Sequence, residues 1–71
     1  MTVEEWVGTF ADEIGVAAPT QEEIDEILRL AAIAAHATER IAAPIACWLA
    51  GSSGRSLGEA LETAEALTTG G

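Results

Sequence analysis

Arginine and histidine are the side chains of this sequence that could bind an anionic group, and several of them share one face of a predicted helix. At about 100° per residue, the residues on that face are Glu22, Asp25, Glu26, Arg29, Ile33, His36 and Arg40. Such a face could receive a phosphate or a carboxylate from a partner, and an exposed Ile33 would add an apolar contact. The alternative is a solvated face with ion pairs four residues apart, such as Asp25 with Arg29.

The third arginine, Arg55, lies in a loop of glycine and serine residues at positions 51–56. The loop precedes a predicted helix, whose free backbone amides and dipole favour an anion. It lacks the length and the preceding strand of a phosphate-binding glycine-rich loop. A flexible connector is therefore the favoured interpretation, with Arg55 kept as a candidate anion contact.

No set of residues predicts catalysis. Cys47 is the only cysteine and sits in an uncharged apolar run, which favours a buried, inert thiol. One cysteine and one histidine do not complete a transition-metal site, and no carboxylates have calcium-loop spacing. The carboxylates fall at helix starts, where they act as caps. We therefore expect no catalytic residue, no metal, no cofactor and no enzymatic activity.

The charge of the chain excludes several kinds of partner. Twelve acidic residues stand against three basic ones, giving a net charge of −9, whereas nucleic-acid and anionic-membrane binders need basic surfaces. The longest apolar run, residues 41–50, is about half the roughly 20 residues that cross a bilayer. The 49% apolar content predicts a folded chain. A single cysteine and an acidic N-terminus favour the cytoplasm.

Three N-terminal capping boxes predict where helices begin. In each box a hydroxyl accepts a hydrogen bond from the amide three residues later, while the carboxylate at that position accepts one from the cap amide. Apolar residues at helical spacing follow each box. The three pairs are Thr2 with Glu5, Thr20 with Glu23, and Ser56 with Glu59.

These signals predict four helices and no strand. The first runs over residues 3–14 and ends at Gly15, and the second, the longest, runs from residue 21 to about 41. Pro44 forces a break between Ile41 and itself and starts a short third helix, residues 44–50, which ends at Gly51. The fourth covers residues 57–67. The predicted fold is an all-α, orthogonal or irregular four-helix bundle, one domain over 1–67 with a frayed tail over 68–71.

The apolar faces of the four predicted helices define an expected core. We place a central residue or two from each helix in contact with the others. The expected core residues are Trp6, Phe10, Leu28, Ala31, Trp48 and Leu61.

One segment carries a family resemblance. An Ala-His is followed after two residues by Glu-Arg, then by Ala-Ala-Pro and an aromatic-Leu-x-Gly ending. This pattern resembles a small actinobacterial domain of unknown function that occurs alone or fused to molybdenum cofactor guanylyltransferase. Ile41 stands where that family often has proline. The matching residues are His36, Glu39, Arg40, Ala42, Ala43, Pro44, Trp48, Leu49 and Gly51.

The resemblance implies a helical domain associated with synthesis of molybdopterin guanine dinucleotide, without known catalytic residues. We therefore expect a non-catalytic accessory or protein-interaction module whose partner is a protein, such as a molybdenum cofactor enzyme. Its expected site centres on His36, Glu39 and Arg40. One alternative is a domain that binds a phosphate ligand or cofactor with Arg40, His36 and Arg55. Another is a homodimer of unrelated role.

Overall fold

The computed structural model describes residues 1–69 of the chain. It contains four α-helices, and no strand occurs among these residues. The all-α, four-helix class predicted from the sequence is therefore confirmed. The helices are α1 (Val3–Ile14), α2 (Gln21–Ala37), α3 (Ala42–Ser52) and α4 (Leu57–Thr69).

All three predicted capping boxes are formed. At the start of α1 the Thr2 hydroxyl accepts from the Glu5 amide at 3.1 Å, and the Glu5 carboxylate accepts from the Thr2 amide at 2.8 Å. The hydrogen bonds from the backbone and the hydroxyl of Thr2 lower the pKa of Glu5. The same reciprocal pairs begin α2 and α4.

Helix α1 ends as predicted, at Gly15. This glycine adopts φ 78°, a left-handed conformation that favours glycine. Its amide donates to the Asp12 carbonyl at 3.2 Å, and the Val16 amide donates to the Ala11 carbonyl at 3.0 Å. These bonds satisfy two of the carbonyls that a helix end leaves without partners.

The corner between α2 and α3 lies earlier than the predicted break. Helix α2 ends at Ala37, and a turn follows in which the Ala42 amide donates to the Glu39 carbonyl at 3.0 Å. Pro44 is the third residue of α3. The first amides of a helix have no intrahelical acceptor, so a proline there removes no hydrogen bond. Helix α3 can therefore begin two residues before its proline.

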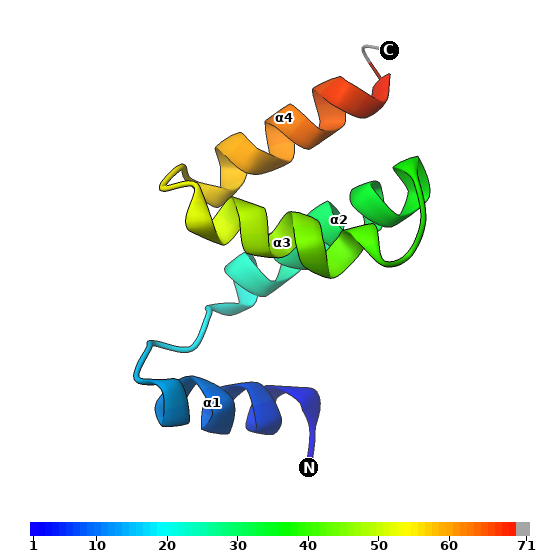
Figure 1. Cartoon of the computed structure of the whole chain (residues 1–71). Helices are drawn as coiled ribbons and strands as arrows, with labels where there is room; N and C mark the ends of the chain where they lie inside the picture. Colours follow the sequence, from blue (N-terminus) through cyan, green and yellow to red (C-terminus); the bar gives the residue numbers. More distant parts are fainter. Residues whose placement is uncertain (70–71) are drawn as a thin grey trace.

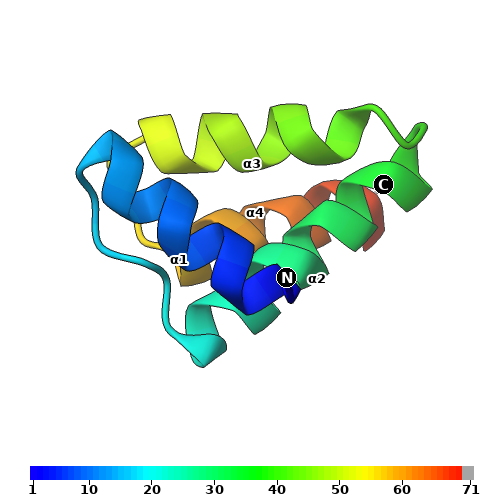
Figure 2. The ribbon, with the colours of Figure 1, turned by 90° about the horizontal axis from the view of Figure 1, so that it is seen from below.

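Helix α2 is the centre of the packing, because α3 and α4 both pack against it. Figures 1 and 2 show α1 and α4 on opposite sides of the pair formed by α2 and α3. No Cα atom of α1 lies within 8 Å of a Cα atom in another helix, whereas closely packed helices have axes 8 to 10 Å apart. The molecule is thus a three-helix body with α1 loosely apposed to it.

The expected core is wrong at four of its six positions. Leu61 is buried and Ala31 is half-buried, but Trp6, Phe10, Leu28 and Trp48 are exposed. The prediction assumed that the apolar faces of all four helices meet, whereas α1 buries Ala11 and leaves its aromatic residues exposed, and the largest side chains of α3 are exposed as well. Among residues 1–69 the buried apolar residues are Ala11, Leu30 and Leu61.

Candidate interaction surfaces

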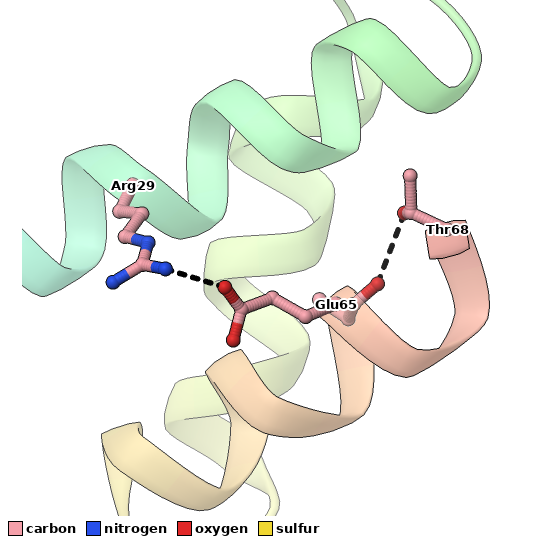
Figure 3. A network of polar contacts seen from close by, with 4 residues as sticks. Arg29, Glu65 and Thr68 are labelled. Atoms are coloured by element: carbon pink, nitrogen blue, oxygen red, sulfur yellow. Dashed lines mark hydrogen bonds and ion pairs between the residues drawn. The ribbon is translucent and has the colours of Figure 1, made fainter. Parts of the chain in front are cut away.

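Arg29 joins α2 to α4. Its guanidinium donates to the Glu65 carboxylate at 2.5 Å (Figure 3). Close by, in the last turn of α4, the Thr68 hydroxyl donates to the Ala64 carbonyl at 3.0 Å. The expected pairing of Arg29 with Asp25 does not form. The Arg29 and Glu65 side chains are 62% and 39% exposed, so this pair contributes at most about 1 kcal/mol to stability. Arg29 is therefore a structural contact between helices.

The other motif residues lie at the corner between α2 and α3. His36 is in the last turn of α2, while Glu39 and Arg40 are in the turn that follows. All three are exposed, and none of these side chains has a hydrogen bond or ion pair among residues 1–69. Ile33 is half-buried, so it is less available for contact than expected from its place on the polar face.

Arg55 lies far from this corner. Helix α3 has 11 residues and is therefore about 16 Å long. Arg40 precedes the first residue of α3, and Arg55 follows the last residue of the same helix. The structure thus leaves His36 and Arg40 at the same corner and Arg55 at the opposite end of α3.

Two apolar grooves lie beside α3. The larger, of about 470 Å³, is the α3–α4 groove, with Arg55 at its rim. A smaller one, of about 260 Å³, runs between α2 and α3 and ends at Arg55 and Leu57. Ser53, Arg55 and Thr63 supply the polar lining of the larger groove. Its other lining residues are Leu30, Ala46, Leu49, Ala50, Ala60, Ala64 and Leu67.

Helix α3 distributes its side chains in an unusual way for a helix of a monomeric bundle. The half-buried residues of α3 are all small, namely Ala42, Ala43, Ala46, Cys47 and Ala50. The large apolar residues Ile41, Ile45 and Trp48 recur at helical spacing and are exposed, with Trp48 69% exposed. No charged residue occurs between Ala42 and Ser52. We call Ile41, Ile45 and Trp48 the α3 face.

Cys47 is held in an apolar setting. Its thiol is 3.9 Å from the Ile27 carbonyl oxygen on α2, and desolvation by burial raises its pKa. A higher pKa lowers the thiolate fraction at neutral pH, and the thiolate is the reactive form. Cys47 is half-buried, whereas the sequence predicted a buried thiol, and its lack of reactivity stays a prediction.

We expect iodoacetamide to alkylate Cys47 more slowly at pH 7 in the folded protein than in the urea-unfolded chain. The pH at which the folded protein reaches half its maximal rate should lie above that of the unfolded chain, because burial raises the thiol pKa. Mass spectrometry of timed samples measures both rates. A faster reaction in the folded state would indicate an activated thiol.

The residues that the structure describes form a small helical domain with exposed apolar surfaces. They contain no group of three metal-ligating side chains, and none of their helices is long and apolar enough to span a membrane. The chain belongs to a family described as a domain of unknown function, DUF6457, which matches residues 1–70. No curated protein matches the chain, and neither does any solved structure.

Proposed function

We propose that this protein is a non-catalytic interaction module that binds a partner protein through the α3 face. The observation that carries this proposal is the distribution of side chains on α3, whose half-buried residues are small while Ile41, Ile45 and Trp48 remain exposed. Burying a side chain of that size is worth about 1.5 to 3 kcal/mol. Exposed apolar residues that gather on one helix without a charged residue between them favour a site of protein contact.

The surroundings of the α3 face resemble an interface in their distribution of polar groups. Protein interfaces have an apolar centre and a polar rim, and tryptophan and arginine dominate their binding energy. Trp48 lies within the α3 face, and the exposed polar side chains of His36, Glu39 and Arg40 stand at the corner where α3 begins. In the proposed complex Arg40 binds a carboxylate of the partner, for which its planar guanidinium is suited.

The proposed partner is molybdenum cofactor guanylyltransferase. The support for this choice is the resemblance of residues 35–51 to a domain found fused to that enzyme. The phosphate-ligand alternative receives less support, because Arg55 lies at the other end of α3 from Arg40 and the grooves are mainly apolar.

A binding titration tests this proposal with the purified guanylyltransferase of the same organism as the probe. Calorimetry should show binding to the wild-type protein and about a thirty-fold weaker affinity for Trp48→Ala, the loss expected for a central interface residue. The matched control is Leu28→Ala, which removes an exposed apolar residue from α2 and should bind as wild type does.

Two results would contradict the proposal. If the wild-type protein does not bind the enzyme, the proposed partner is wrong. If the enzyme binds Trp48→Ala and wild type equally well, the α3 face is not the contact surface. Arg40→Lys then tests whether Arg40 binds a carboxylate of the partner, because lysine keeps the positive charge but cannot make the bidentate hydrogen bonds of a guanidinium.

A further inference from the structure

Helix α1 has an apolar stripe that the rest of its own chain leaves largely uncovered. Trp6 and Phe10 stack with ring centroids 5.1 Å apart, and each is half or more exposed. Val3 and Ile14 extend the row at helical spacing and are also exposed. We call these four residues the α1 stripe.

The surface area of the chain indicates that a contact of interface size is missing. The chain exposes 5407 Å², whereas a compact monomer of 7.3 kDa exposes about 4,200 Å². The excess, about 1,200 Å², is more than the roughly 800 Å² per partner that a stable interface buries. Both the loosely apposed α1 and the open α3–α4 groove leave apolar side chains exposed, among them Trp6, Phe10 and Leu49.

The groove and the stripe lie on different sides of one molecule. Helices α1 and α4 are on opposite sides of the α2 and α3 pair (Figures 1 and 2), and the groove is lined by α3 and α4. The α1 stripe therefore does not fill the groove of its own chain. A second molecule can present the same stripe to that groove.

The charges beside the α1 stripe and at the rim of the α3–α4 groove have opposite signs. Arg55 is exposed at the groove rim, and its guanidinium has no partner among residues 1–69. Helix α1 has no basic residue, and Glu13 lies beside the position of Trp6 on the helix at 100° per residue. A stripe seated in the groove can thus place the Glu13 carboxylate near the Arg55 guanidinium of the other molecule.

We propose that two copies of this chain form a symmetric dimer in which the α1 stripe of each copy occupies the α3–α4 groove of the other. A two-fold arrangement repeats the same contact twice and closes the assembly. This groove is separate from the α3 face, so the dimer and the binding of a partner protein can be tested independently.

Sedimentation equilibrium of the full chain gives the first test. The wild-type protein should have about twice the 7.3 kDa mass of the chain, and Phe10→Ala should weaken association about thirty-fold. The control Thr9→Ala changes the neighbouring residue on the polar side of α1 and should leave association unchanged. A monomeric wild type, a mass that keeps rising beyond two chains, or equal effects of the two variants would overturn the proposal.

Disulfide trapping tests which surfaces meet. In a Cys47→Ser background, a chain with Glu13→Cys and a tagged chain with Arg55→Cys are mixed and oxidised, after circular dichroism has confirmed that both fold. The expected product is the mixed disulfide between the two chains. Pairing mainly of like chains would overturn the proposal. So would a disulfide within one chain that carries both cysteines.

Charge reversal provides a further measurement that leaves the apolar contacts intact. Arg55→Glu should weaken association, and adding Glu13→Arg to the same chain should restore it, because each interface then pairs opposite charges again. Trp48→Ala should keep the dimer mass, since Trp48 lies outside the groove. If adding Glu13→Arg does not restore the association lost in Arg55→Glu, the proposed placement of the α1 stripe in the α3–α4 groove is wrong.

Discussion

Replacing Leu30 with alanine is expected to lower the free energy of unfolding by about 2 to 5 kcal/mol. Leu30 is 4% exposed and lies where α2 meets α3, lining both grooves. The loss combines reduced apolar burial with a cavity that neighbouring helices fill only in part. Since a domain of this size has a stability of roughly 4 to 10 kcal/mol, this loss is a large fraction of the total and should clearly lower the urea concentration at the unfolding midpoint.

Leu28→Ala is the matched control for this prediction. It makes the same chemical change on the same helix, but Leu28 is 62% exposed, so its removal should cost less than about 1 kcal/mol. Urea unfolding followed by circular dichroism at one chain concentration measures both variants. Equal losses would show that α2 is rotated about its axis relative to the structure described above.

Leu61→Ala is expected to have an effect of similar size, again about 2 to 5 kcal/mol. Leu61 is 7% exposed and is the buried leucine of α4, the helix that packs on the side of α2 and α3 opposite to α1 (Figure 1). Its loss removes the main apolar anchor of that helix. Thermal unfolding should show a clearly lower midpoint with α4 frayed or detached.

The control on α4 is Leu67→Ala, because Leu67 is 79% exposed. Measured at a concentration where the wild type is monomeric, this variant should unfold within about 1 kcal/mol of wild type. Hydrogen exchange of the α4 amides distinguishes local detachment from global unfolding. Unchanged protection in Leu61→Ala would mean that α4 is held by other contacts, such as the Arg29–Glu65 ion pair.

Local signals were enough to predict the secondary structure. The capping boxes and Gly15 depend on hydrogen bonds between residues at most five positions apart, so their geometry follows from the sequence itself. The break between α2 and α3 was predicted from Pro44, but its position was four residues too late. Proline excludes itself from the interior of a helix, yet the first turn accepts it at more than one position.

The candidate site was predicted less well than the helices. Sequence periodicity placed His36 and Arg40 on one face of a single helix, whereas α2 ends at Ala37 and Arg40 lies in the turn that follows, so the two residues share only the corner between α2 and α3. Sequence periodicity also placed Arg29 on that face as a candidate contact, whereas Arg29 pairs with Glu65. That partner lies 36 residues away along the chain, so no local spacing could have indicated it.

The sequence by itself determined the four helices, the capping boxes that begin three of them and the acidic character of the chain. The tertiary structure decided which apolar residues are buried. On α2 it buries Leu30 and leaves Leu28 exposed, whereas the helical pattern favoured Leu28 as a core residue. It also left the α1 stripe and the α3 face exposed. The physical reason is that a helical pattern shows which residues share a face, whereas burial depends on how closely another helix approaches that face.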